Sequence, residues 1–557
     1  MARIIEQAGG ARAALGVGLA GQIGIAGITV AVTLASCEVS SRTASRTTSK
    51  PITKSANMPR VDPGVESHGG TSTIGAAPAV TNVMSAALPT SEPQMRVRIV
   101  SAADTVRITC PGGVEIGQGE PKGTTTLSPG AKTEKRAGVS VALKSGQWQV
   151  AEIGVPGLAG ATPGGGVGGM AHSYGATLSL VVLPSVAGQT LSVNGTSYPG
   201  TVRLSSRTDV RSDAFDVVDF VNIEDYLPGV VGKEMLAGWP LAAYQAQAVA
   251  ARTYALHERQ RSAAAAYDVE SNDRDQVYGG TTTNATAREA VRSTRGMVLL
   301  DGDKLLRTYF SSTCGGRTAA AKDTWPIGPG FEYNLAAPIQ EHHRDFACQA
   351  SPLFRWSVER PRWELAQRMK WFGERFGNPV KKIKDVRSIE IALLNSDGRP
   401  SKYRVSESSG GQHMLSAEEL RLACNTNANG SLITLAPMDD VDRPGAGKQR
   451  PPRVAVETGD IMGFGGAGES TKPAAALGAP AVPAVPLTVP DIDRRTRVHS
   501  SDFEVVIKGE KVTITGRGFG HGVGLCQYCA KAFAERGEDW RMMLGRFYPG
   551  ARVTNMY

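Results

Sequence analysis

The residues that point most directly to chemistry lie between Asp219 and Tyr254. Glu234 follows a short apolar segment and precedes a loop that contains Trp239. Pro240 then opens an Ala- and Gln-rich segment that is typical of a helix and extends past Arg252. A carboxylate beside a helix, with an aromatic ring and an arginine nearby, is an arrangement that acid–base chemistry uses. The alternative is that Glu234 is a surface residue in front of a packing helix.

Length and composition limit what the chain can be. A chain of 557 residues predicts two or three domains with linkers, and a hydrophobic fraction of 41% is enough for a sizeable core. The net charge of +9 suits a polyanionic partner. No run of lysine and arginine with interleaved aromatic residues is present, so we expect no nucleic-acid partner. An anionic membrane or an anionic wall polymer remains.

The first residues resemble a secretory signal. Arg3 and Arg12 precede an apolar, Gly-rich stretch that ends in Leu-Ala-Ser-Cys at Cys37. This ending matches the bacterial lipobox and predicts a lipoprotein signal peptide over residues 1–37, with Cys37 lipidated. An ordinary signal peptide or an uncleaved anchor is the alternative. Each version places the rest of the chain in the cell envelope, and the lipid would anchor it to a membrane.

The remaining chain divides by its local patterns and predicts an α+β fold class. Alternating apolar and polar residues predict a β-rich lead-in, and a mixed α/β core follows it. The predicted parts are a disordered tether (38–94), a β-rich lead-in domain (95–205), a core (206–435), a Pro/Ala/Gly-rich insertion (436–497) and the C-terminal part of the core (498–557). Helices are predicted over 240–260, 286–294, 363–376 and from Ser416, which has capping-box spacing to Glu419, and a strand hairpin over 503–516.

Several sequence blocks occur in one order along the chain. They are residues 222–231 followed by Glu234-Met235, then 246–256, 276–280, 294–299, 310–318 and 518–528. In this order they resemble the stage II sporulation protein D family, also called the SpoIID/LytB or amidase-enhancer family. The resemblance covers the chain from about residue 95 onward, apart from 436–497.

The resemblance implies a bacterial cell-wall protein. Catalytic members are lytic transglycosylases, which cut the MurNAc–GlcNAc bond of peptidoglycan, preferably in glycan strands stripped of peptides, and leave 1,6-anhydro ends. The family's catalytic carboxylate in Val-Val-x-x-Glu-Met falls on Glu234. One carboxylate suffices for this reaction, because the sugar's own 6-hydroxyl is the nucleophile. The alternative is a non-catalytic glycan-binding protein that recruits or enhances a peptidoglycan amidase.

The resemblance also suggests residues that contact substrate, each with a structural alternative. Gln276 and Tyr278 could bind sugar hydroxyls and stack on a pyranose ring, or support the fold. Lys233 could bind the lactyl carboxylate or face solvent, and His521 could line the cleft or be a buried, hydrogen-bonded histidine. The expected substrate-binding set is Lys233, Arg252, Gln276, Tyr278, Ser311, Ser312, Thr313 and His521. Arg252 could instead pair with Glu224 or Asp225.

Six cysteines remain besides Cys37. A disulfide between Cys314 and Cys348 is preferred over a nucleophilic Cys314, since an oxidising compartment favours disulfides. Cys526 and Cys529 could form a redox pair or half of a metal site, but packing of small buried residues is the preferred interpretation. The zinc-binding run that some family members carry before Gln-x-Tyr is replaced here by residues 269–276. We therefore expect no zinc there, no metal and no cofactor.

Overall fold

The computed structural model describes residues 91–119, 134–154, 172–175, 179–207, 209–272, 274–428, 489–493 and 495–557. All of these belong to one structural unit. The predicted signal peptide, the lipidation at Cys37, nearly all of the tether and most of the predicted insertion lie outside the described residues. In the part of the chain that is described, no helix combines the length and the hydropathy needed to cross a membrane.

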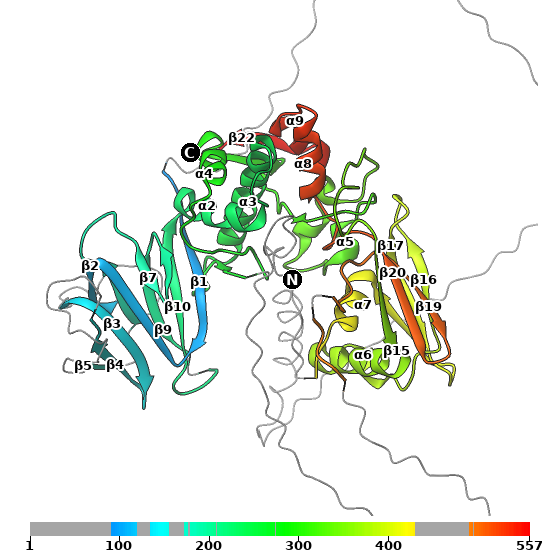
Figure 1. The fold of residues 1–557 in the computed structure, drawn as a ribbon, viewed down its shortest axis with the longest axis horizontal. Helices are drawn as coiled ribbons and strands as arrows, with labels where there is room; N and C mark the ends of the chain where they lie inside the picture. Colours follow the sequence, from blue (N-terminus) through cyan, green and yellow to red (C-terminus); the bar gives the residue numbers. More distant parts are fainter. Residues whose placement is uncertain are drawn as a thin grey trace, which may run out of the picture. The chain divides into compact units, whose positions relative to one another are not determined.

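A large sheet of 11 strands dominates the N-terminal part, drawn from blue to teal in Figure 1. Its main path runs β11-β1-β10-β9-β6-β2-β3-β4-β5, and β7 and β8 extend from β2. Neighbouring strands are antiparallel except β1 and β11. The strands are β1 (Gln94–Ala103), β2 (Thr105–Gly119), β3 (Glu134–Lys144), β4 (Gln147–Glu152), β5 (His172–Gly175), β6 (Ser179–Pro184), β7 (Leu191–Val193), β8 (Thr196–Tyr198), β9 (Thr201–Ser206), β10 (Phe215–Asn222) and β11 (Val269–Glu270).

The strand patterns explain this sheet. Val106, Ile108 and Cys110 of β2 point to one buried face, because successive side chains of a strand alternate between the two faces. Trp148 meets Phe215 edge to face at 5.3 Å across that core. The prediction of a β-rich part is therefore confirmed. However, the sheet crosses the predicted boundary at residue 205, since β10 and β11 belong to it.

Helices follow directly from this sheet. β10 continues without a loop into the first of the described helices, and the long Ala-rich helix comes after a short turn. The helices are α2 (Ile223–Glu234), α3 (Leu241–Arg261), α4 (Ala285–Ser293), α5 (Ala321–Thr324), α6 (Arg362–Phe376), α7 (Ala417–Cys424), α8 (Gln527–Glu535) and α9 (Trp540–Phe547), with 3-10 turns η1 (Glu332–Leu335), η2 (Ala337–Ile339) and η3 (Pro379–Lys382). Figure 1 shows α8 and α9, in red, beside the green α3, and both contact it.

Smaller sheets tie the C-terminal part to earlier segments. The strands are β12 (Met297–Asp301), β13 (Lys304–Leu305), β14 (Phe310–Ser311), β15 (Trp356–Pro361), β16 (Ser388–Leu394), β17 (Pro400–Ser406), β18 (Gln412–Ser416), β19 (Phe503–Lys508), β20 (Lys511–Gly516), β21 (Leu525–Cys526) and β22 (Arg552–Asn555). β22 pairs with β12, and β21 pairs with β14 in parallel. β20 lies between β15 and β19.

Two hydrophobic cores result. The first joins one face of the large sheet to α2, α3, α4, α8 and α9. The second contains α6, α7 and strands β15 to β20. The predicted hairpin at 503–516 is confirmed as β19–β20, and the predicted capping box at Ser416 and Glu419 is confirmed at the start of α7.

Candidate functional site

Glu234 is the last residue of α2, and Met235 ends the helix with an extended backbone. The sequence predicted only a short apolar segment here, because Pro228 and two glycines are poor helix formers. Burial of one side of α2 in the first core outweighs that low propensity. A loop of six residues, 235–240, then separates Glu234 from α3, whose start after Pro240 is as predicted.

The glycines of α2 explain how Glu234 reaches its partners. A side chain at Gly229 would collide with the carbonyl oxygen of Gly280 and with the ring of Tyr278. A side chain at Gly232 would come too close to the Thr282 side chain. These residues let the helix lie directly against the segment 276–282, since glycine permits close approach of two backbones. That approach brings the backbone of Val277 to the carboxylate.

Two amide groups hold the Glu234 carboxylate, one on each oxygen. The backbone N–H of Val277 donates to Oε1 at 3.2 Å, and the side-chain amide of Gln527 donates to Oε2 at 3.5 Å. Glu234 itself is half-buried. Beside it, Trp239 meets Tyr528 edge to face at 4.9 Å, and the backbone N–H of Tyr528 donates to the carbonyl of Ser312. Residues from three distant parts of the chain therefore surround one carboxylate.

Gln527 was not singled out as a site residue from the sequence. It lies inside the Gly-rich block at 518–528, and only its contact with Glu234, 293 residues away, separates it from its neighbours. The Gln-Tyr pair at the end of that block was the available signal. Gln527 and Tyr528 are 6% and 8% exposed, so both are held by packing.

Gln276 and Tyr278 lie in the core rather than in an open cleft. The Gln276 amide donates to the carbonyl of Ala251, and its oxygen accepts from the Tyr226 hydroxyl. Tyr278 is 4% exposed and packs against the Tyr226 ring at 4.8 Å. These contacts favour the structural alternative for both residues. They fix the segment that carries the Val277 N–H.

A buried carboxyl lies beneath this segment. Asp219 of β10 accepts a hydrogen bond from the Tyr278 hydroxyl at 3.1 Å, and its other oxygen has no partner among the described residues. Burial raises the pKa of Asp219 to about 7, although the Tyr278 hydrogen bond opposes this shift. Asp219 is fully buried, so it supports the site without reaching a substrate.

Arg252 is also fully buried, and its predicted contact with substrate has no support in the structure. Its guanidinium makes two hydrogen bonds of 2.8 Å to the Glu224 carboxylate, which confirms the alternative pairing. Burial by itself would raise the pKa of the Glu224 carboxyl. The Arg252 guanidinium outweighs this effect and holds that pKa below its usual value. The pair links α2 to α3 and leaves Glu224 unavailable for catalysis.

The Ser-Ser-Thr segment after β14 has mixed surroundings. Thr313 is buried and exchanges a hydrogen bond of 2.8 Å with the Ser351 hydroxyl. The Ser311 hydroxyl is buried without a partner in the described residues. Ser312 is half-buried, and its carbonyl accepts from Tyr528 beside Glu234. Of the three residues, Ser312 has the direct contact with the candidate site, through its hydrogen bond to Tyr528.

His521 and Lys233 differ in exposure. The Nδ1 atom of His521 accepts from the backbone N–H of Val523 at 3.0 Å, and the ring packs on Trp325. Burial lowers the pKa of His521 to about 3, and the Arg421 and Arg399 charges add to that effect. These contacts favour a hydrogen-bonded, structural histidine, although His521 is half-buried rather than fully buried. Lys233 is exposed next to Glu234, and its side chain covers Gly279.

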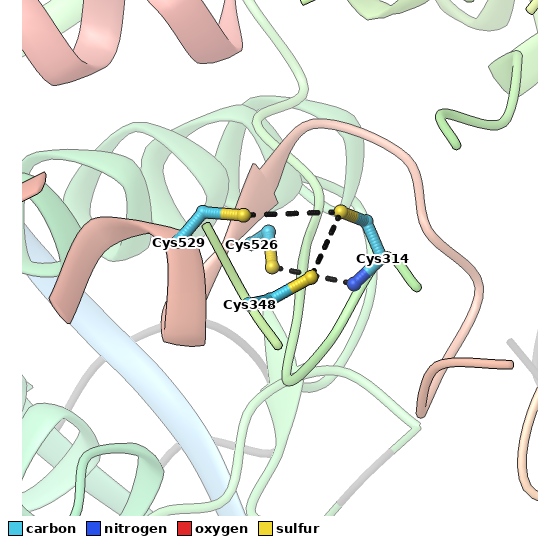
Figure 2. Close-up of side chains that lie close together, drawn as sticks. All are labelled: Cys314, Cys348, Cys526 and Cys529. Carbon is cyan, nitrogen blue, oxygen red and sulfur yellow. Dashed lines mark hydrogen bonds between the residues drawn. The ribbon is translucent and has the colours of Figure 1, made fainter. Parts of the chain in front are cut away.

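A second group of residues was only partly anticipated. Cys314 and Cys348 are free thiols with sulfur atoms 3.6 Å apart, so the predicted pair is close but not joined. Cys526 and Cys529 lie against the same pair, as Figure 2 shows. The expectation of no metal left this cluster of four out, because the ligands come from three separate stretches of sequence.

A groove of about 820 Å³ lies on the second core, apart from Glu234. Trp363, Gln367 and Trp371 of α6 line it, together with Lys384 and Asp385. Two carboxylates also line it: Asp385 accepts from the backbone N–H of Ser408, and Glu510 accepts from Arg362. Neither belongs to the sequence blocks described above, whereas Glu234 does, so we place the candidate active site at Glu234.

Comparisons with known proteins match the part of the chain that carries this site. A family model described as Stage II sporulation protein, SpoIID, matches residues 211–300. The amidase enhancer of Bacillus subtilis (strain 168) is 26% identical over 334 residues, which is 59% of this chain and 40% of that protein. An uncharacterized protein of Brachyspira hyodysenteriae is 25% identical over 365 residues, 65% of this chain and 74% of that protein.

The Stage II sporulation protein D of Bacillus subtilis is 38% identical over 64 residues, 12% of this chain and 19% of that protein. The chain therefore matches less than half of the length of the amidase enhancer. Glu234, Arg252, Gln276 and Tyr278 lie inside the family match, and Gln527 lies outside it.

Proposed function

Because the chain carries a SpoIID-family domain over residues 211–300, we propose that it is a lytic transglycosylase of bacterial peptidoglycan. Its substrate would be the glycan strand, cut between N-acetylmuramic acid and N-acetylglucosamine. Glu234 would be the catalytic acid and base. The observation that carries this proposal is the half-buried Glu234 carboxylate held by one amide donor on each oxygen.

The reaction requires one proton-transferring carboxyl. Protonated Glu234 gives its proton to the glycosidic oxygen as the bond from that oxygen to the muramic C1 breaks. The 6-hydroxyl of the same muramic residue forms the new bond to C1 and returns a proton to Glu234. The products are a 1,6-anhydro end and a free 4-hydroxyl, and no water is consumed.

The neighbouring carboxylates support a one-carboxylate mechanism. Glu224 is tied to Arg252, and Asp219 is buried below Tyr278. A hydrolytic glycosidase needs a second carboxylate about 5–10 Å across the bond to activate water or form a covalent intermediate. Because both acids are engaged in the fold, neither is placed to act as that second carboxylate.

The other groups around Glu234 have roles that fit a sugar ligand. Gln527 and the Val277 N–H fix the plane of the carboxylate, which limits its motion before proton transfer. Trp239 is half-buried next to Tyr528, and such rings present apolar faces on which pyranose rings pack. Lys233 is the exposed cation nearest in sequence to the carboxylate, and it suits the lactyl group of muramic acid.

The assay uses purified full-length chain and glycan strands stripped of stem peptides. We expect 1,6-anhydro ends in the products, detected by mass spectrometry. Glu234→Gln should lower their rate of formation by about 100-fold or more, because proton transfer is lost, while the Val277 N–H can still donate to the side-chain oxygen that remains. Asp225→Asn is the matched control, since Asp225 is an exposed carboxylate on the same helix.

Anhydro ends formed equally fast by Glu234→Gln would remove Glu234 from the mechanism. If the wild-type chain binds the strands without making anhydro ends, the second candidate function applies. That candidate is a glycan-binding enhancer of an amidase, favoured by the similarity to the amidase enhancer of Bacillus subtilis. It predicts faster release of stem peptides when the chain is added to a peptidoglycan amidase.

The proposed site of action is the cell envelope. The Cys37 lipid would hold the chain at a membrane surface, and the net charge of +9 would favour the anionic wall polymer. Globomycin-sensitive processing and labelling of Cys37 with a fatty-acid analogue in the producing bacterium test this placement. A chain that remains unlabelled and unprocessed contradicts it.

A further inference from the structure

Four buried cysteines converge on one point beside the candidate active site. Their sulfur atoms all lie within 4.8 Å of one another. The side chains come from different directions and turn their sulfur atoms inward, as Figure 2 shows. Each residue is at most 1% exposed. The cluster consists of Cys314, Cys348, Cys526 and Cys529.

The sulfur spacing identifies the kind of bonding that the cluster suits. The Cys314 sulfur lies 3.6 Å from that of Cys348 and 3.9 Å from that of Cys529. A disulfide would need about 2.05 Å. Tetrahedral zinc with Zn–S bonds of about 2.3 Å places its sulfur ligands about 3.8 Å apart. The two observed sulfur–sulfur distances, 3.6 Å and 3.9 Å, lie just below and just above this value.

The chain around the cluster also suits a metal bound by thiolates. Cys526 is the N-cap residue directly before α8, and Cys529 lies in the first turn of α8, a Cys-x-x-Cys spacing common to zinc half-sites. The backbone N–H of Cys314 donates to the Cys526 sulfur at 3.2 Å, and that of Ala347 donates to the Cys529 sulfur at 3.4 Å. Such bonds to sulfur stabilise the thiolate form and orient the ligands.

A positive group supplies a second, independent observation. The Arg344 guanidinium interacts with Cys314, Cys526 and Cys529. Its Nη1 donates to the carbonyl of Gly524, whereas its buried Nε and Nη2 have no hydrogen-bond partner among the described residues. A buried hydrogen-bond donor without an acceptor lowers the stability of the fold, and within the described part of the chain Arg344 has two such donors. Four thiolates bound to one divalent ion carry a net negative charge. The two Arg344 donors would face and partly neutralise that charge.

We propose that Cys314, Cys348, Cys526 and Cys529 bind one zinc ion as a tetrahedral, four-thiolate structural site. The four thiols release their protons as the metal binds, so each contributes a thiolate ligand. No coordination position is left for water, which makes the site structural rather than catalytic. Its role is to fasten α8 to the loops that hold Cys314 and Cys348.

The location of the site gives it a role in positioning. Gln527 and Tyr528 are the two residues between the ligands Cys526 and Cys529. They are also the residues that contact Glu234 and Trp239. A metal that fixes the backbone on both sides of Gln527 fixes one wall of the candidate active site. The metal itself takes no part in proton transfer.

The test measures metal in the full-length chain, purified without chelator from cells supplied with zinc. We expect about one zinc per chain by elemental analysis, with iron below a tenth of that amount. Exchange with Co²⁺ should give the visible absorption of a tetrahedral cobalt thiolate. Mass spectrometry of the non-reduced protein should find the four cysteines unlinked. None of these readouts requires glycan or activity.

Matched variants keep the test specific. Cys529→Ala should lower the zinc content at least tenfold, whereas Cys424→Ala should retain it, because Cys424 is equally buried but lies in the second core. Zinc kept by Cys529→Ala would overturn the proposal. So would a folded wild-type chain that contains two disulfides and no zinc, or one that contains iron instead. These wild-type measurements decide the matter even if Cys529→Ala fails to fold.

Discussion

At the scale of single residues, Glu234 combines a feature visible in sequence with one that is not. Its type and its place before an Ala-rich helix are readable from the sequence. Its two amide partners, Val277 and Gln527, come from residues 43 and 293 positions away. Local pattern carries no information about such distances. This is also why four cysteines could be counted in the sequence while their convergence could not be predicted.

Burial decides which of the other polar residues can meet a substrate. Gln276, Tyr278 and Arg252 were expected at the glycan, yet all three are at most 4% exposed. The sequence cannot distinguish a polar residue that contacts ligand from one that holds a segment in place, because both need the same hydrogen-bonding groups. Here Gln276 and Tyr278 fix the segment that carries the Val277 N–H, and Arg252 links α3 to α2.

The buried carboxyl of Asp219 predicts a pH-dependent difference in stability. Its folded pKa of about 7 lies above the unfolded value near 3.9, so the folded state binds the proton more tightly. Stability from this group is fully present below about pH 4 and is lost as the pH rises to about 7. Asp219→Asn has no such loss and should gain up to about 4 kcal/mol relative to wild type across that window.

Urea unfolding at several pH values between 4 and 8 measures this difference. Asp303→Asn is the control, since the Asp303 side chain is 85% exposed. A relative stability of Asp219→Asn that stays constant with pH would show that the pKa of Asp219 is the same in the folded and unfolded states.

At the scale of elements, the predicted helices differ in how they are stabilised from α2, which the sequence did not predict. α3 follows from its Ala- and Gln-rich sequence, and α6 from its amphipathic pattern. α2 contains Pro228 and Gly229 and forms because packing against the segment 276–282 stabilises it. Tertiary contacts outweigh local propensity there. The candidate catalytic residue therefore lies at the end of a helix that the sequence did not predict.

The buried ion pair between α2 and α3 predicts a large cost for breaking it. Arg252→Met leaves the Glu224 carboxylate buried, and among the described residues only the Gly296 N–H and the Tyr557 hydroxyl remain as its partners. We expect a loss of about 3–5 kcal/mol in the free energy of unfolding, measured with urea. Arg292→Met removes the exposed pair with Glu289 on α4 and should cost at most about 1 kcal/mol. Similar losses for both variants would contradict the distinction.

At the scale of the whole molecule, the α+β class was predicted correctly because strand alternation and helix composition are local signals. Which strands pair with one another could not be predicted from such local signals. β10 joins β1 across more than a hundred residues, and β20 joins β15 across a similar distance. Pairings of this kind depend on which exposed edges remain when the chain folds, and no single segment records them.

The net charge predicts how binding depends on salt. A chain with net charge +9 should bind an anionic wall polymer more weakly as salt rises, because screening shortens from about 10 Å at 0.1 M to about 3 Å at 1 M. Sedimentation of the chain with insoluble peptidoglycan at increasing NaCl measures this. Glu234→Gln should show the same salt dependence as wild type. Binding that is unaffected by salt would point to packing and hydrogen bonds as the source of affinity.

The pairing of β20 with β15 and of β22 with β12 has a consequence for synthesis. A ribosome delivers residues 91–428 first, and this length contains the large sheet, α2 and Glu234. Neither core is complete at that stage, because β19, β20, α8 and α9 have not yet emerged. The nascent chain must keep two incomplete hydrophobic surfaces apart until residues 498–557 arrive. Those same residues carry Gln527 and two of the four thiols, so the active-site wall and the metal ligands are added in the same final step.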